Sequence, residues 1–210
     1  MRRLILGGVA AIVLLIAAVV VVSYLRGRDT PPAPKLPAQE AAPTGPLRGE
    51  LRPAAGSFVG YRVNETLIGV GLNAAVGRTS AVKGAAGVAG GRIVAARFEI
   101  ETGTLRSDEA RRDETMRFRG LETDRYPKAG FVLTAPATLA ARFTARGRLT
   151  LHGRTRPVKV RLQSRRDGAG VDLAGSTPIE FSDYGMEPPS VAGVASVRDH
   201  GKLEVRLRLR

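Results

Sequence analysis

Residues able to do catalytic chemistry are few in this 210-residue chain, and their spacing fits no known reaction centre. The two histidines, His152 and His200, both lie in glycine-containing turns without a second ligand at metal-binding spacing. Cysteine is absent, which excludes a thiolate nucleophile, a thiolate metal site and a disulfide. No Gly-x-Ser-x-Gly element occurs. The sequence therefore predicts a protein that is not an enzyme, with no metal site, no cofactor and two solvated turn histidines.

The densest group of ionisable residues lies between Ser107 and Arg125, where six acids stand among five arginines. Because the charges nearly cancel, the group favours a network of ion pairs over a catalytic acid and base. Within this network we expect Arg112 to pair with Asp113. Alternating apolar runs flank residues 107–131, so we expect a short polar helix and turn between two strands, crossing one end of the fold. Tyr126-Pro127 is expected to steer the chain back into the sheet.

The N-terminal region has the composition of a membrane segment followed by a linker. Residues 4–25 carry no charge, enough for about 33 Å of helix at about 1.5 Å per residue. We predict a signal anchor, a single transmembrane helix over residues 1–28, with the domain outside. The alternative is a cleaved secretory signal, but the apolar stretch is long and no small-x-small site ends it. Residues 29–50 contain six prolines and no apolar periodicity, which predicts an extended tether that does not pack.

Residues 51–210 are expected to form one domain of about eight or nine antiparallel strands, each with one apolar face. The clearest alternation runs from Ala141 to Leu151, where apolar residues alternate with arginine and threonine. Residues 152–157 are expected to form a turn, after which Val158, Val160 and Leu162 return antiparallel. Closure into a barrel is favoured because it removes exposed strand edges.

The composition of the inward positions bears on whether the barrel is hollow. These positions are mostly Val, Leu, Ala and Gly, and the chain contains no Trp, so a barrel of this size is expected to be under-filled and to take an apolar ligand. A flattened sandwich with a dry core is the alternative, and composition does not decide between them. For each predicted ligand-binding residue, plain core packing also stays open. These residues are Val59, Tyr61, Val63, Phe98, Ile100, Phe131, Leu133, Phe143, Leu149, Leu151 and Phe181.

The net charge of +14 raises the question of an anionic partner. Nine Lys or Arg residues and no acid lie between Arg142 and Arg166, most of them expected to point away from the apolar face. We predict no nucleic-acid binding, because Phe143 is the one aromatic residue of that stretch and lies on the opposite face. Two interpretations stay open: a face near anionic lipid or envelope polymer, or charge that serves solubility alone.

Four motifs follow one another within residues 51–210. They are SFVGYRV at 57–63, RRDETMRFRGLETDRYPKAGF at 111–131, GRLTLHGRTRPV at 147–158 and FSDYGM at 181–186. In this order they resemble the YceI-like polyisoprenoid-binding proteins of the bacterial envelope. The chain departs from the family pattern at Tyr184, where Phe is usual, at Ser182, where Arg often precedes the Asp, and in the Gly/Ala-rich residues 70–84.

The resemblance implies an antiparallel, lipocalin-like β-barrel whose lumen holds an isoprenoid-like or other amphiphilic lipid. The complete expectation is an all-β fold with one short helical insertion, preceded by the transmembrane helix. The chain would then be a membrane-tethered, extracytoplasmic lipid-binding protein. The alternative is a structural or interaction module of the envelope with a filled core and a basic face for anionic lipid or polymer.

Overall fold

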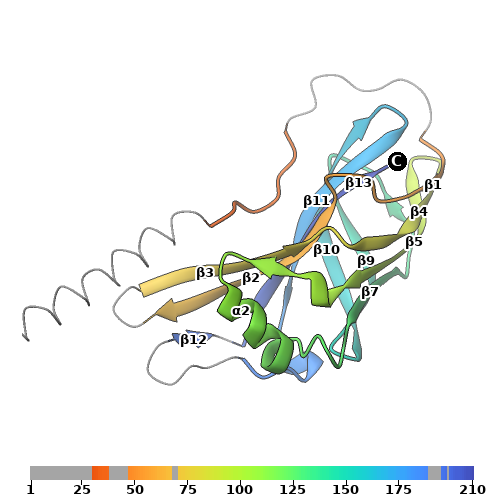
Figure 1. Ribbon diagram of the computed structural model, residues 1–210. Coiled ribbons are helices and arrows are strands. Elements are labelled where there is room, and N and C mark those ends of the chain that lie inside the picture. Colours follow the sequence, from red (N-terminus) through yellow and green to blue (C-terminus); the bar gives the residue numbers. More distant parts are fainter. Residues whose placement is uncertain (1–29, 38–46, 68–70, 189–194, 198) are drawn as a thin grey trace, which may run out of the picture.

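One curled antiparallel sheet, with a short helical segment at one end, forms the fold in the computed structural model (Figure 1). The structure describes residues 30–37, 47–67, 71–188, 195–197 and 199–210. The predicted membrane segment, residues 1–28, lies outside this part of the chain. Among the described residues, no helix has the length and apolar character needed to cross a membrane.

Thirteen strands are described in this sheet. They are β1 (Gly49–Leu51), β2 (Phe58–Leu67), β3 (Gly71–Thr79), β4 (Val82–Ala89), β5 (Arg92–Glu101), β6 (Arg106–Ser107), β7 (Lys128–Leu133), β8 (Ala137–Thr138), β9 (Arg142–Leu151), β10 (Arg154–Asp167), β11 (Gly170–Ile179), β12 (Ala195–Val197) and β13 (Gly201–Leu209). The helical elements are the 3-10 turn η1 (Thr102–Thr104), the helix α2 (Ala110–Thr115), the π-helical turn η2 (Met116–Gly120) and the 3-10 turn η3 (Ser182–Tyr184).

The main path of the sheet follows the order β1-β4-β5-β7-β9-β10-β11-β13-β2-β3-β6, with β8 on β5 and β12 on β2. The C-terminal strand β13 lies between β11 and β2, which brings the two ends of the domain together. After β1, the chain bridges to β13 at Pro53 and Leu209, and Arg52 and Arg210 exchange backbone hydrogen bonds of 2.7 and 2.9 Å. No ladder joins β1 to β6 in the described residues. The antiparallel all-β prediction is confirmed, and the sheet is a curled half-barrel instead of a closed cylinder.

The hairpin between β9 and β10 is tighter than the sequence predicts. Its loop consists of His152 (φ 50°) and Gly153 (φ 71°), and Leu151 pairs directly with Arg154. Two successive residues with positive φ form the kind of turn whose twist matches that of the strands. The expected turn over residues 152–157 is therefore wrong in its length, because β10 already begins at Arg154.

The segment between β5 and β7 is helical at its centre, as predicted, but its ion pairs differ. Arg112 binds Glu65 at 3.2 Å and also pairs with Asp108, four residues earlier. Asp113 Oδ1 instead accepts hydrogen bonds from the backbone N–H and the hydroxyl of Ser107, at 2.9 and 2.7 Å. The expected Arg112–Asp113 pair is wrong, because neighbouring residues of a helix point to different sides whereas residues four apart meet.

The predicted tether over residues 29–50 also differs from the structure where it is described. Leu47 is a buried member of the hydrophobic core, and β1 begins at Gly49. Residues 30–37 contact the sheet, since the backbone N–H of Leu36 donates to Gln163 Oε1 at 3.2 Å. The tether was expected not to pack because it lacks apolar periodicity, but its backbone groups find polar partners on the sheet.

Two glycines on the inner face make room for aromatic rings. A Cβ atom at Gly77 would lie 2.4 Å from the Tyr61 ring, and one at Gly147 would lie 2.4 Å from Phe131 and 2.6 Å from the backbone oxygen of Val132. Real Cβ atoms do not approach other atoms so closely. The positions of both rings therefore depend on glycine.

We predict that Gly147→Ala lowers the free energy of unfolding by about 1–3 kcal/mol, because Phe131 and the β7 backbone must shift. Urea denaturation followed by circular dichroism measures this difference. Gly103→Ala is the control, since a Cβ atom there meets nothing within 4 Å. Equal midpoints for the two variants would contradict the account of Gly147.

Candidate functional site

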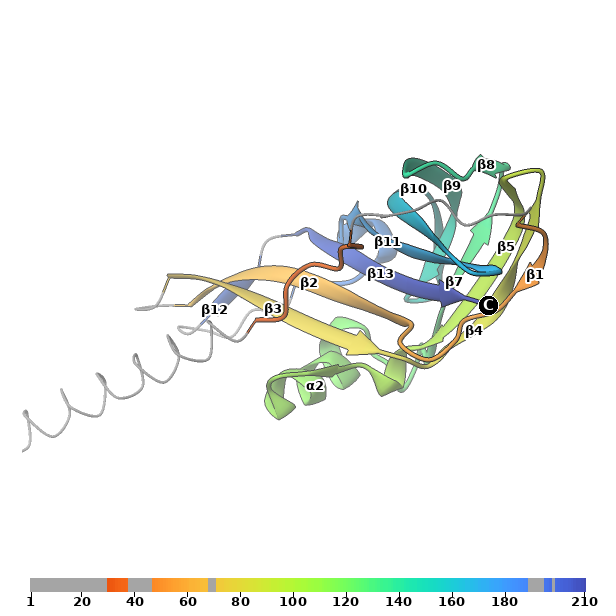
Figure 2. The same cartoon turned by 90° about the horizontal axis from the view of Figure 1, so that it is seen from above.

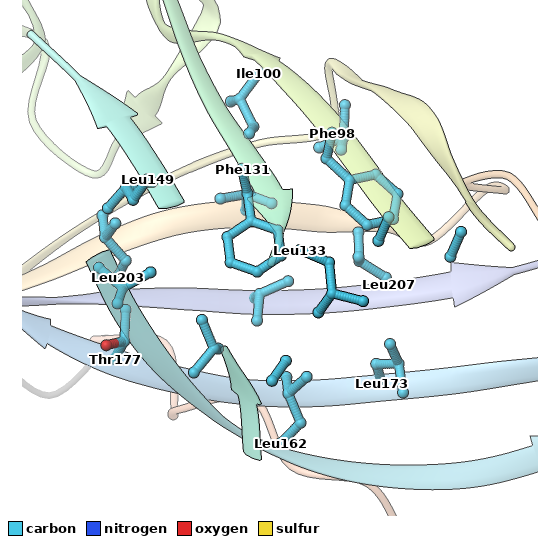
Figure 3. A pocket seen from close by; sticks show the side chains of 18 of the residues that line it. Phe98, Ile100, Phe131, Leu133, Leu149, Leu162, Leu173, Thr177, Leu203 and Leu207 are labelled. Atoms are coloured by element: carbon cyan, nitrogen blue, oxygen red, sulfur yellow. The ribbon is translucent and has the colours of Figure 1, made fainter. Parts of the chain in front are cut away.

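The curled sheet encloses an apolar cavity of about 120 Å³ (Figure 3). Figure 3 shows lining side chains that come from β5, β7, β9, β10, β11 and β13, among them the rings of Phe98 and Phe131. The lining residues are Val59, Val82, Ala86, Ile93, Ala96, Phe98, Ile100, Phe131, Leu133, Ala145, Leu149, Val158, Val160, Leu162, Leu173, Thr177, Leu203, Glu204, Val205, Leu207 and Leu209.

The two polar residues of this lining have partners elsewhere. The hydroxyl of Thr177 donates to the carbonyl oxygen of Lys159 at 3.2 Å. Glu204 lies between the inward residues Leu203 and Val205, so the strand alternation turns its side chain to the outer face. There its carboxylate binds Arg62 at 2.5 Å. The space inside the sheet is therefore bounded by hydrocarbon.

Six of the predicted ligand-binding residues line the cavity. They are Val59, Phe98, Ile100, Phe131, Leu133 and Leu149. The other five, Tyr61, Val63, Phe143, Leu151 and Phe181, are inward or core residues that do not line it.

Most of these remaining residues lie toward the end of the sheet near η3. Phe181, which precedes η3, is buried with Leu151 in the hydrophobic core. Its ring and the Val63 side chain would both lie 3.1 Å from a Cβ atom at Gly201. Phe181 therefore closes this end of the sheet through contacts with residues far from it in the sequence. Alternation along a single strand does not reveal such contacts.

The sequence reasoning missed all lining residues on β4, β10, β11 and β13, together with Ile93 and Ala96 of β5 and Ala145 of β9. The signal for two of these strands was present, since Val158, Val160 and Leu162 alternate along β10 and Leu203, Val205, Leu207 and Leu209 along β13. Val82 and Ala86 lie in the glycine-rich β4, where the alternation is hidden by small residues. Their inward position follows from the pairing of β4 with β5.

Two buried tyrosines near this cavity stay uncharged at neutral pH. Burial raises the pKa of Tyr61 to about 12, against the opposing effect of Arg112. Burial, followed by the nearby charge of Asp183, raises the pKa of Tyr184 to about 12. The Tyr184 hydroxyl has no hydrogen-bond partner within the described residues. These phenols therefore add no charge beside the apolar space.

His152 is buried, in contrast to the solvated position expected for it. Its Nδ1 lies 3.1 Å from the carbonyl oxygen of Tyr184, and its Nε2 lies 3.4 Å from Glu122 Oε1. The ring of Tyr126 packs against the imidazole with a centroid separation of 4.2 Å. The histidine thus joins the β9–β10 turn to η3 and to the segment before β7. His200 is exposed, as predicted.

Arg154 and Arg156 lie on an unexpected face of β10. The register pairs them with Leu151 and Leu149, so they continue the inward face beyond Val158, although both are exposed. Most cations of residues 142–166 were expected to point away from the apolar face. The two-residue turn sets a register that places these two arginines on the inward side instead. The inward side of β10 therefore changes from apolar to cationic along its length.

Comparisons with known proteins agree with this architecture. The YceI-like domain family matches residues 52–209. The structure of BcnA from Burkholderia cenocepacia is similar with a TM-score of 0.60 at 17% identity, over 74% of this chain and 97% of that one. A polyisoprenoid binding domain from Saccharophagus degradans, implicated in plant cell wall breakdown, gives a TM-score of 0.58 at 18% identity, over 78% and 98%. No curated protein sequence matches the chain.

Proposed function

The chain belongs to the YceI-like domain family, and from this premise we propose that it binds a lipid and does not catalyse a reaction. In this proposal it is a membrane-tethered, extracytoplasmic protein that holds an isoprenoid-like or other amphiphilic lipid inside its curled sheet. The observation that carries the proposal is the cavity lined by hydrocarbon from β2, β4, β5, β7, β9, β10, β11 and β13. Its similarity to the polyisoprenoid binding domain of Saccharophagus degradans supports the choice of lipid.

The size of the cavity bears on how a lipid would be held. Its volume of about 120 Å³ is close to the roughly 150 Å³ of an engineered apolar cavity that binds benzene. Each buried CH₂ group contributes about 0.8 kcal/mol, so even a short segment of an isoprenoid chain gains appreciably from this space. A longer chain requires the lining to rearrange, and Phe131, Leu133 and Leu203 are among its partly buried members.

We predict that Val160→Phe, which places a ring in the cavity, reduces co-purified lipid by about tenfold or more, since the ring displaces several CH₂ groups. Organic extraction of the purified protein followed by mass spectrometry measures the lipid, and the wild type is expected to carry it in stoichiometric amount. Val132→Phe is the matched control, because Val132 is exposed and pairs with the outward-facing Arg148. Wild-type protein without lipid, or full retention in Val160→Phe, would count against the proposal.

The cationic end of β10 suggests how an amphiphile would be oriented. With its tail against Val158, Val160 and Leu162, an anionic head group would lie toward Arg156 on the same face of the strand.

We predict that Arg156→Glu weakens binding of an anionic prenyl phosphate about tenfold, with less effect on the matching neutral prenol, because a charged hydrogen bond contributes about 1.5–3 kcal/mol. Binding is measured by competition with a fluorescent apolar probe. Arg148→Glu, an exposed substitution on the outward side of β9, serves as the control. Equal losses for both ligands would assign Arg156 no part in recognising the head group.

The membrane tether in this proposal rests on the uncharged residues 4–25. We predict that the full chain stays with membranes after a carbonate wash, and that external protease reaches the domain in intact spheroplasts. Removal of residues 1–28 should release the protein, because about 20 apolar residues are needed to span a bilayer. Release of the intact chain by carbonate would exclude the anchor.

The alternative, a module that binds anionic lipid or polymer through its outer surface, draws on the exposed residues Arg142, Arg146 and Arg148 of β9. Two results together would favour this function over lipid storage. The wild-type protein would carry no lipid, and it would sediment with anionic vesicles whereas the Arg148→Glu variant would not.

A further inference from the structure

Residues 30–37, with the sequence TPPAPKLP, lie along the outer face of the sheet (Figure 2). Arg62 donates to the carbonyl oxygen of Pro31, and Arg78 to that of Pro32, both at 2.6 Å. At the far end of the segment, the Leu36 backbone N–H donates to Gln163 Oε1 at 3.2 Å. These partners come from β2, β3 and β10, so the segment crosses the sheet transversely over β13 and β11.

The composition of the segment suits this position. Proline lacks a backbone N–H and favours the extended polyproline II conformation, which has no internal hydrogen bonds and leaves its carbonyl groups free to accept. Four of the eight residues are proline, which leaves few backbone donors to be satisfied against the sheet. Because the extended form exists before contact, little conformational entropy is lost on docking.

The arginines that hold the segment are themselves fixed by a buried acid. Glu204 has 1% of its surface exposed and binds Arg62 at 2.5 Å and Arg78 at 3.5 Å. Arg78 and Glu204 approach one another over Gly60, which is the register neighbour of both and has no side chain to separate them. Arg78 also lies over the Phe58 ring, 4.5 Å from its centroid. Both guanidinium groups are therefore held in place, with N–H groups left for the proline carbonyls.

The burial of outward-facing residues follows the path of the segment. Val76 pairs with the outward Arg62, yet only 5% of its surface is exposed. The contacts of the segment surround it, since Thr30 donates to the carbonyl oxygen of Ala74 at 3.5 Å and Arg62 and Arg78 bind the next two residues. Ala174, the register neighbour of Gln163, is fully buried although it also faces outward. On β9, outside this path, the outward arginines are exposed.

From these contacts we infer that the outer face formed by Arg62, Arg78, Glu204 and Gln163 is a binding site for a proline-rich extended segment, and that residues 30–37 occupy it within the same chain. The segment is thus a docked strap and not a free tether. The hydrogen bond from Thr30 to the carbonyl oxygen of Ala74 holds the start of the strap at β3. The inference stands independently of whether the cavity holds a lipid.

The absence of cysteine from the chain permits a direct test with one reporter thiol. Val76→Cys places a thiol beneath the strap in the full chain, and its rate of reaction with a chromogenic disulfide reports exposure. We expect this rate to rise about tenfold when Pro31→Gly and Pro32→Gly are added, because glycine lacks the restriction to the extended conformation that proline provides. Gln163→Ala should give a smaller increase, because it removes one neutral hydrogen bond.

Lys202→Cys is the matched reporter, because Lys202 faces outward beside Arg62 but is exposed. Its thiol should react rapidly, and at one rate, in every background, which separates strap release from unfolding of the sheet. The inference would be overturned if, in the otherwise wild-type chain, the thiol of Val76→Cys reacted as fast as the thiol of Lys202→Cys. A slow Val76→Cys rate that the proline substitutions leave unchanged would also overturn it, because the arginine side chains alone would then be the cover.

Discussion

The structure depends on the requirement that one face of every long strand be removed from water while each backbone group keeps a partner. Antiparallel pairing satisfies the backbone, and curling the sheet brings the apolar faces together. Small residues permit this curvature, as at Gly147, where the Phe131 ring and the β7 backbone approach closely. The cavity follows from the same constraint, because Val, Ala and Leu side chains on a sheet this wide do not fill the space they enclose.

The two sides of the sheet carry different kinds of interaction. Inside, the lining is hydrocarbon and the nearby phenols of Tyr61 and Tyr184 are neutral. Outside, buried acids organise arginines. Burial alone would raise the pKa of Asp172, but hydrogen bonds from Arg210 and Arg165 lower it below its usual value. Arg62 and Arg78 beside Glu204, and Arg165 and Arg210 beside Asp172, are therefore part of the fold. The arginines of β9 and of the start of β10 are exposed.

The ends of the curled sheet are where contacts distant in sequence matter most. Near η3, Phe181, Tyr184 and Leu151 join the core, and His152 links the β9–β10 turn to Glu122 and Tyr126. This end is thus closed by packing that combines three separate parts of the chain. On the outer face of the sheet, residues 30–37 are a further distant part of the chain that packs against the domain. Their backbone carbonyl groups, instead of apolar side chains, hold them there.

Alternation is a local property of each strand, so the amino-acid sequence predicts the antiparallel all-β fold and much of the inward face, and the polar stretch between two strands predicts the helical insertion. Phe98, Ile100, Phe131 and Leu149 line the cavity for that reason. Tertiary structure decided which inward residues close the end instead, as Phe181 does, and it selected Glu65 and Asp108 as the partners of Arg112. It also buried His152 and docked the proline-rich segment. These outcomes depend on register and on contacts between residues far apart in the chain, which no local pattern contains.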